Sequence, residues 1–568
     1  MAESNYLASH LSDPKYQYDL VLGTTAEAIN ATMKMYLYKD PSPPVEVWYQ
    51  QETVGGPVTP MDPIPGVDPF SVPTDGTVPD AILQSNFVFA IKAGFGLPSG
   101  VSPLDLPDIV SLTGDSQTVG YNLFFADFDI VTLEWGRHGT HAWKNYQQPS
   151  GSPFIFKFSV DMNLDPADPH APFSNLPPDV QRQLQNYNTS TAFSVQQLYL
   201  DLNNAGLQRM PIITGIPSNS PVYNTIQSNF VNTYWNQIAQ QGKFILGYAV
   251  HGHSNPSSRA SLQPTSLNFK SNPHYDASGN PTTSTQLYTL NYLMNTNVSR
   301  PLTVGAAFPW NWVTTDEASS FHGAMSVRRE IFANYLNNSI STQLGNICIK
   351  PYSHINLSSA GFKWSASWNI SPDNGQSFTY QPAGNAEILK LSYSSSSNSH
   401  DKSGLISGHF NMASTTTGSV SVEGNAITIA LDSTVTMDFD NGDLGSATVK
   451  GRVGGYSATA KLLVSVDASG AVSVTEADGY PKVTDKGADI DSGFMAGLDK
   501  TVNVGNSLKS MYSNMTSYMQ SIPGHIETYL NSTGGKWIFP GGQTLVFKDA
   551  AFSTYQDFVA HVTYADPV

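Results

Sequence analysis

The run Arg137-His138-Gly139-Thr140-His141 contains the residue types best suited to chemistry. An imidazole can act as a nucleophile or carry a proton, and a neighbouring guanidinium can hold a phosphate through paired hydrogen bonds. These properties raise one hypothesis, a hydrolase built around Arg137 and His138. The competing interpretation is that the run is a polar strand end with no catalytic role.

The same run resembles the Arg-His-Gly-x-Arg-x-Pro signature of the histidine acid phosphatases, with two departures. His141 stands where the signature has its second Arg, and Trp143 stands where it has Pro. A neutral imidazole does not replace a guanidinium that clamps phosphate. The family also needs a later His-Asp acid, and His400-Asp401 matches it within a Ser-rich stretch that predicts a mobile hairpin tip. We therefore rank a phosphatase-like hydrolase last and expect that the protein is no enzyme.

Metal and thiol chemistry have little support in the sequence. His251 and His253 would share one face of a strand, but no third metal ligand is evident. Cys348 is the single cysteine and cannot form an internal disulfide. Its neighbours Ile347 and Ile349 indicate a strand and a buried, inert thiol. We expect neither a metal site nor a cofactor.

Charge and length exclude several classes of partner. The 568 residues include 28 Lys and Arg against 45 Asp and Glu, giving a formal net charge of −17. This acidic field disfavours nucleic acid and electrostatic docking on anionic membranes. No stretch approaches the ~20 apolar residues of a transmembrane segment, and the first residues show no signal peptide. We expect a soluble protein that is cytoplasmic or released without a signal peptide.

The residue pattern predicts an elongated α+β protein made mainly of antiparallel sheet. Apolar periodicity predicts helices over 24–38, 223–241, 323–338 and 491–531. Thr24 and Glu27 form a capping box at the start of the first helix, and Pro523 should kink the last. Alternation and turn residues predict a long loop at 53–80, a Ser/Thr-rich meander at 350–476 and a closing hairpin at 536–564. In that hairpin, Lys536–Phe539 would pair with Thr544–Phe547.

The predicted helix at 491–531 carries the widest apolar stripe, in which Met and Tyr recur at every third or fourth position. The stripe consists of Leu508, Met511, Tyr512, Met515, Tyr518, Met519 and Ile522. Burying each large side chain is worth roughly 1.5–3 kcal/mol, so a curved sheet should wrap the helix. Thioethers and tyrosine rings adapt to irregular partners. We therefore predict that the first six of these residues bind the acyl chain of a lipid.

The order helix, meander, helix occurs twice and divides the chain into 1–319 and 320–568. The chain ends also contain Tyr18-Asp19-Leu20-Val21-Leu22-Gly23 and Trp537-Ile538-Phe539-Pro540-Gly541-Gly542-Gln543-Thr544-Leu545-Val546-Phe547-Lys548. These segments, with 287–301, resemble the clostridial neurotoxin-cluster accessory (OrfX-type) proteins of the tubular lipid-binding (TULIP) superfamily. The resemblance implies two TULIP-like modules, each with long helices wrapped in a twisted antiparallel sheet. It also implies lipid or membrane-surface binding and a protein partner in a toxin-type complex, and it supplies no catalytic residues.

Three hypotheses follow from the sequence. The first is a non-catalytic protein that binds a lipid or another hydrophobic ligand. The second is a structural or interaction protein whose cores are filled by its own side chains. The third is the hydrolase around Arg137 and His138. An open apolar cavity separates the first from the second, and polar groups that converge on His138 would favour the third.

Overall fold

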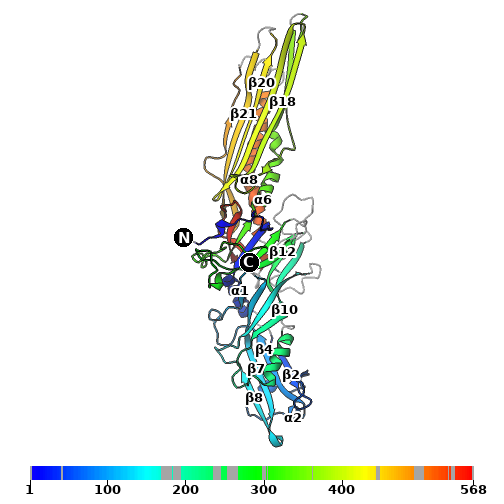
Figure 1. Ribbon diagram of the computed structural model, residues 1–568, viewed down its shortest axis with the longest axis vertical. Coiled ribbons are helices and arrows are strands. Elements are labelled where there is room, and N and C mark those ends of the chain that lie inside the picture. Colours follow the sequence, from blue (N-terminus) through cyan, green and yellow to red (C-terminus); the bar gives the residue numbers. More distant parts are fainter. Residues whose placement is uncertain are drawn as a thin grey trace.

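The computed structural model shows an elongated molecule in which two wings extend in opposite directions from a central sheet (Figure 1). It describes the whole chain except 1–2, 40–42, 115, 168–181, 183–192, 235–244, 253–265, 297–301, 303–304, 361–362, 443–447, 491–503, 535–536, 539–543 and 566–568. Both termini lie near the middle of the molecule. In the part of the chain that the structure describes, the strands form five sheets and every strand pair is antiparallel, which confirms the predicted sheet type.

The central sheet joins strands from both sides of residue 320. Its order is β12 (Ser266–Asn272), β13 (Thr289–Asn295), β1 (Leu20–Thr25), β14 (Gly323–Val327), β27 (Phe558–Ala565) and β25 (Thr544–Phe547), with β26 (Ala551–Phe552) also on β27. Leu22 of β1 pairs with Tyr292 on one side and with Met325 on the other. The helices α1 (Ala26–Lys39) and α6 (Arg329–Ser341) follow directly on β1 and β14.

Two sheets and a helical segment build the lower wing in Figure 1. One sheet has the order β3 (Thr59–Met61), β2 (Val45–Gln50), β4 (Phe87–Phe95), β7 (Phe125–Trp135) and β8 (His141–Gln147). The other has the order β24 (Trp537–Ile538), β11 (Ile245–Gly252), β10 (Phe193–Arg209), β9 (Phe156–Ala167), β6 (Thr118–Leu123) and β5 (Val110–Leu112). The ring of Phe125 lies 5.1 Å from those of Phe156 and Tyr234. These contacts join both sheets to the segment that follows α4 (Pro221–Thr225) and η5 (Ile226–Phe230).

Long strands and the helix α8 (Val504–Gly534) build the upper wing. Its large sheet has the order β17 (Thr379–Tyr380), β18 (Glu387–Ser403), β19 (Ile406–Glu423), β20 (Ala426–Asp440), β21 (Thr448–Val466) and β22 (Val472–Glu476), with β23 (Lys482–Asp485) also on β21. The strands β15 (Ile349–Ser358) and β16 (Lys363–Pro372) form a separate hairpin. Gly424 lies in the tight turn between β19 and β20 with a φ of 58°, and Gly470 lies in the turn between β21 and β22 with a φ of 82°. The predicted meander is therefore present over 379–476, whereas 349–372, which were expected to belong to it, form the separate hairpin.

Side chains of β18 hydrogen-bond the backbone of β15, an arrangement that we call the serine clasp. Four side chains of β18 each accept one backbone N–H group. Ser397 accepts from Ser353 at 2.9 Å, and Ser399 accepts from Ile355 at 3.0 Å. Asp401 accepts from Leu357 at 2.5 Å, and Ser403 accepts at 2.9 Å from Ser359, which directly follows β15. Each pair is separated by 44 residues in the chain, so the two strands run in the same direction. The Ser-rich stretch was expected to be a mobile hairpin tip, but it is regular strand up to Ser403 because these acceptors satisfy a neighbouring backbone.

Several short segments depart from the sequence predictions. Residues 323–327 form a strand, and α6 starts at Arg329. The cap of α1 is Thr25, which accepts from the Ala28 N–H at 3.2 Å, and Thr24 lies inside β1. The long helix is described from Val504, since 491–503 lie outside the described residues, and Pro523 lies within it. In the described part of the segment that follows, β24 (Trp537–Ile538) pairs with β11 and β25 pairs with β27, so these two strands do not form the predicted hairpin with each other.

The remaining predicted elements agree more closely. The predicted helix at 223–241 is helical from Pro221 to Tyr234, beyond which 235–244 lie outside the described residues. The expected loop at 53–80 contains only β3 and short turns, of which η2 (Pro69–Ser71) is one, before α2 (Asp80–Leu83). The other short helical turns are η1 (Tyr6–Ala8), η3 (Arg137–Gly139), η6 (Thr285–Leu287) and η7 (Leu344–Asn346).

Candidate functional site

The predicted stripe of α8 lies on one face of the helix and is covered by the upper wing itself. Four of the six predicted ligand-binding residues are almost fully buried, with exposed fractions of 4% for Leu508, 6% for Tyr512 and 0% for Met515 and Met519. Met511 and Tyr518 are partly buried at the edge of the same core. Further along the helix, Ile522 and Ile526 continue the buried face.

The strands β21 and β22 and the helix α6 hold α8 in place. The Tyr456 hydroxyl lies 2.6 Å from that of Thr516, and Glu527 accepts from the Val474 N–H at 2.6 Å. The Tyr518 hydroxyl donates to the carbonyl of Ser339 on α6. Of these three α8 residues only Tyr518 belongs to the stripe, and the buried stripe residues Leu508, Tyr512, Met515 and Met519 are part of the hydrophobic core.

The two parts of the phosphatase-like motif lie at opposite ends of the molecule. Arg137 and His138 form the exposed turn between β7 and β8, at the tip of the lower wing (Figure 1). His400 lies beside His409 near the far end of the upper wing. A nucleophile and a proton donor must approach the same bond, so these residues cannot form one active site in this structure.

The structure adds little support for metal or thiol chemistry. Among the described residues, no group of three His, Cys, Asp or Glu side chains is arranged to hold a metal ion. His253 lies outside the described residues. Cys348 lies just before β15 and is fully buried, and burial raises the pKa of its thiol to about 12. The expected burial of Cys348 is confirmed, and a thiol that stays protonated at neutral pH is a poor nucleophile.

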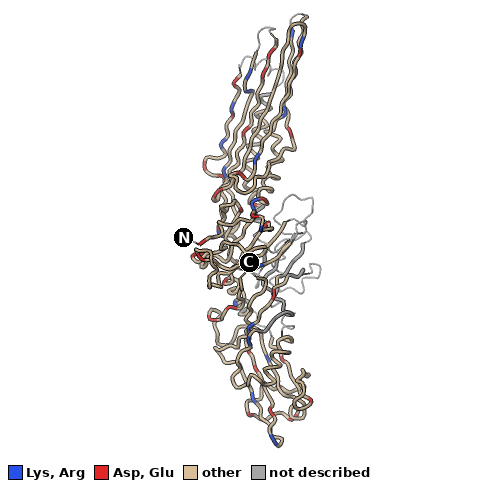
Figure 2. Tube along the Cα trace, in the orientation of Figure 1, with Lys and Arg blue, Asp and Glu red and all other residues tan. Residues whose placement is uncertain are grey.

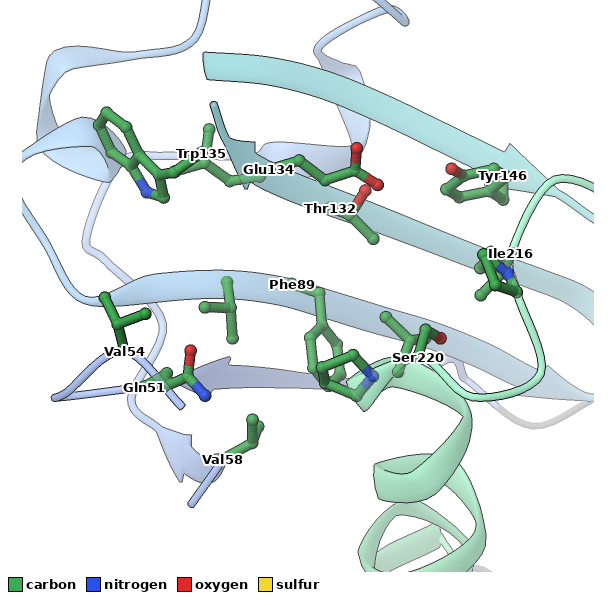
Figure 3. A pocket seen from close by; sticks show the side chains of 15 residues that line it. Gln51, Val54, Val58, Phe89, Thr132, Glu134, Trp135, Tyr146, Ile216 and Ser220 are labelled. Atoms are coloured by element: carbon green, nitrogen blue, oxygen red, sulfur yellow. The ribbon is translucent and has the colours of Figure 1, made fainter. Parts of the chain in front are cut away.

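A cavity of about 300 Å³ opens in the lower wing, between the sheet of β4, β7 and β8 and the start of α4. We call it the wing pocket. Its walls are mostly apolar and are formed by Val58, Val88, Phe89, Leu133, Ile216, Pro217, Pro221 and Val222, with Gln51, Val54, Thr132, Glu134, Trp135, Tyr146 and Ser220 completing the lining. Val54 and Trp135 lie at one end of the pocket, and Tyr146 and Ile216 lie at the other (Figure 3). This volume is at the lower end of the range for small-molecule sites.

The loop that closes one side of the wing pocket is fixed by tight local contacts. The buried Tyr223 hydroxyl accepts from the Ile213 N–H at 2.5 Å and donates to the Pro211 carbonyl at 3.0 Å. Gly215 has a φ of +89°, and a Cβ at this position would lie 2.8 Å from the Tyr146 ring. Glycine is therefore required both by the backbone and by the close approach of Tyr146.

Exposed apolar side chains mark the outer end of the wing pocket. Val54 is fully exposed, and Trp135 is 53% exposed. Glu134 of β7 accepts a hydrogen bond from Lys144 of β8 at 2.9 Å, so an acidic and a basic side chain are paired across these two neighbouring strands. An apolar interior with charged groups at its edge suits a ligand that has an apolar body and a polar end.

The wing pocket could not be recognised from the sequence because its lining residues come from five separate segments, 51–58, 88–89, 132–135, 146 and 216–222. Val88 and Phe89 could be assigned to a strand, but the loop at 213–222 carried no periodic signal that placed it against that strand. The clustered Pro217, Ser220 and Pro221 indicated only a helix start.

Comparisons with known proteins identify distant structural neighbours. No family model matches the chain, and no curated protein matches it. The solved structures that it resembles include P47 of Clostridium botulinum E1, at 10% identity and a TM-score of 0.41, and a lipopolysaccharide binding protein, at 9% identity and a TM-score of 0.29. Each likeness covers 97% of this chain and 100% of the other. Both TM-scores lie below 0.5, so these neighbours decide nothing about function.

The described helices of the molecule are short or polar relative to the hydrocarbon core of a bilayer. Among the described residues, no helix is both long enough and apolar enough to cross a bilayer.

Proposed function

We propose that the protein is a non-catalytic carrier or receptor for a lipid or similar apolar molecule, and that the wing pocket holds the apolar part of that ligand. The observation that supports this proposal is a cavity of about 300 Å³, lined by Val88, Phe89 and Val222, which the chain's own side chains leave unfilled. A ligand that buries ~8 methylene groups there would gain on the order of 6 kcal/mol before ordering costs.

The broader organisation is part of the same proposal. Residues 1–319 and 320–568 would form two TULIP-like modules that share the central sheet. The stripe of α8 is the second candidate site, but Met515 and Met519 are fully buried, so a ligand there must first open the wing. This burial supports the alternative of a self-filled core for the upper wing. A place in a toxin-type complex has only the resemblance of the chain ends as support.

The test is to fill the wing pocket with a side chain. Val88→Trp adds an indole to a partly buried wall position, and Val483→Trp is the matched control on the exposed strand β23. Native mass spectrometry and calorimetric titration with dodecanoic acid and its lysophospholipid ester would measure binding. We expect wild type and Val483→Trp to bind and Val88→Trp to lose binding with a melting temperature close to that of wild type.

Two results would contradict this proposal. Wild type that binds none of several lipid classes would exclude the function. Equal binding by Val88→Trp and wild type would exclude this pocket as the site, and Met515→Arg would then show whether the α8 stripe holds the ligand instead.

A further inference from the structure

The hairpin of β15 and β16 in the upper wing has one long side that pairs with no described strand, and we call it the β16 edge. The hydrogen bonds of the hairpin show which backbone groups lie on this edge. β15 turns the N–H groups of Ser353, Ile355 and Leu357 toward the serine clasp on β18. The β15 residues between them therefore face β16, because the N–H and C=O groups of successive residues point to opposite sides of a strand.

The register of the hairpin carries this alternation over to β16. The three β15 residues that face the serine clasp lie opposite Trp368, Ala366 and Trp364. These residues of β16, and Ile370 in the same alternation, therefore point their N–H and C=O groups away from β15. In the described part of the chain, none of these backbone groups has a hydrogen-bond partner. The β16 edge thus consists of the free backbone groups of these residues.

The residues along the β16 edge are exposed to solvent. Ser365, Ser367 and Asn369, whose side chains point away from the core, are all exposed. On the outer strand β8 of the lower wing, by contrast, the Asp75 N–H donates to the Trp143 carbonyl at 2.9 Å. Proteins commonly cover such edges, because an unpaired strand is a template for another strand. The β16 edge is regular, uncovered by any described strand and therefore suited to strand pairing.

The two ends of β16 limit where another strand can pair. Lys363 stands at one end and Pro372 at the other. Pro has no N–H group, and a lysine on an edge strand opposes the stacking of further strands. The ten residues of β16 span roughly 34 Å at ~3.4 Å per residue. The β16 edge therefore has a defined length that one strand of the same length would fill.

We propose that the β16 edge pairs with the same edge of a second copy of this chain and forms a symmetric antiparallel dimer. Free groups must face free groups, and the register centred on Ser367 pairs all of them. Trp364 then lies opposite Ile370 of the second copy, and Ala366 lies opposite Trp368 of the second copy. The dimer closes on itself, because each copy has then used its free β16 edge.

Side chains on both faces of the β16 edge fit a second copy. Trp364 is 38% exposed, and the pairing places it beside the apolar Ile370 of the second copy. Lys363 would lie diagonally across from Asp373 of the second copy, within reach of a lysine side chain. Acidic and basic residues are mixed along the upper wing rather than gathered in one patch (Figure 2). The formal net charge of −17 opposes the contact of two copies, so salt that screens it should strengthen the dimer.

Disulfide cross-linking of the full chain tests the register. In the proposed dimer the two Cα atoms of Ser367 lie ~4.5 Å apart, which suits a disulfide, whereas those of Asn369 lie roughly 14 Å apart. Ser367→Cys should therefore form a reducible dimer about tenfold faster than the matched control Asn369→Cys. Cys348 is buried and should not compete in either protein.

Sedimentation velocity tests the pairing without a cross-link. The interface is small, so we expect association to appear only as the protein concentration approaches ~0.5 mM, and to strengthen as NaCl is raised from ~0.05 M to ~0.5 M. Ala366→Pro removes an N–H group that has no partner within the described chain, so it should weaken the dimer about tenfold. Its melting temperature should stay close to that of wild type. Ser367→Ala keeps every backbone group and should associate like wild type.

Three results would overturn the proposal. The first is a wild type that stays monomeric at every concentration and salt. The second is a Ser367→Cys protein that cross-links no faster than Asn369→Cys. The third is a folded Ala366→Pro protein that dimerises as strongly as wild type, which would place the contact elsewhere. If Ala366→Pro melts early, the two cysteine variants decide. The β16 edge lies in the upper wing, so none of these results bears on the ligand of the wing pocket.

Discussion

The ring of Tyr512 on α8 stacks on the ring of Tyr456 on β21, with centroids 4.6 Å apart and planes inclined by 16°. The Tyr456 hydroxyl lies 2.6 Å from that of Thr516, one helical turn further on. Strand and helix are thus joined by both an aromatic contact and a polar one. Offset aromatic pairs add about 0.5–1.5 kcal/mol beyond the area that they bury. The stripe of α8 is therefore part of the core of the upper wing.

This packing predicts the effect of a charge on the helix. Met515→Arg should destabilise the upper wing by several kcal/mol, because Met515 is fully buried and an unpaired guanidinium there loses its hydration. Asn514→Arg, at the exposed neighbouring position, is the control and should change the free energy of unfolding by less than ~0.5 kcal/mol. Urea unfolding followed by circular dichroism measures both. A Met515→Arg protein as stable as wild type would show that the stripe faces a space able to admit solvent.

The sequence predicts helices and hairpins well where one local rule decides the outcome. The meander was recognisable because Gly424 and Gly470 stand in tight turns between alternating strands. The stripe of α8 was visible because its apolar residues recur at helical spacing from Leu508 to Ile522. In both cases the information lies within a few residues of the element itself.

Long-range pairing explains the errors. Residues 323–327 form a strand because β1 and β27 offer open edges on both sides, although Val327 also fits a helical stripe with Ile331 and Tyr335. Trp537–Ile538 pairs with β11 of one sheet, whereas Thr544–Phe547 pairs with β27 of another. Both pairings depend on strands that are not recognisable as partners from the local sequence. The wing pocket was missed for the same reason, since its walls meet only in three dimensions.

The serine clasp makes a second prediction. Ser397→Ala with Ser399→Ala removes two acceptors and leaves the N–H groups of Ser353 and Ile355 without them. We expect a loss of about 1–3 kcal/mol and faster hydrogen exchange at these two amides, measured by NMR or mass spectrometry. The matched control changes two exposed serines of the same strand, Ser394→Ala with Ser396→Ala, and should leave both quantities unchanged.

The third prediction concerns Asp557, a buried carboxylate that contacts the N-terminal segment. Asp557 accepts the Leu11 N–H at 2.6 Å, the Arg329 N–H at 2.9 Å and the Ser9 hydroxyl at 3.1 Å. Asp557→Asn replaces one oxygen by an NH₂ group that faces these donors, so it should cost about 1–3 kcal/mol. Limited proteolysis should then cut the N-terminal segment faster than in wild type. Unchanged protection of that segment would show that Asp557 does not hold it in place.

The last prediction concerns His561 of β27, which lies between two rings and two carboxylates. Its ring centroid is 4.0 Å from that of Phe321 and 3.9 Å from that of Tyr6. Its Nδ1 is 2.7 Å from a carboxylate oxygen of Asp549, and its Nε2 is 3.6 Å from one of Glu317. Burial alone would lower the pKa of His561, but Asp549 and then Glu317 outweigh burial and raise it.

The sign of the pH dependence follows from this shift. A folded-state pKa above the unfolded one means that the folded protein holds the proton more tightly. The stabilisation is therefore complete below pH ~6.5, the ordinary pKa of His, and is lost as the pH rises through the raised value. The melting temperature of wild type should fall between pH 6 and pH 9 more steeply than that of His561→Gln. The control His138→Gln changes an exposed turn and should keep the wild-type slope. Equal slopes in wild type and His561→Gln would show that the proton on His561 does not stabilise the contact between Tyr6 and the central sheet.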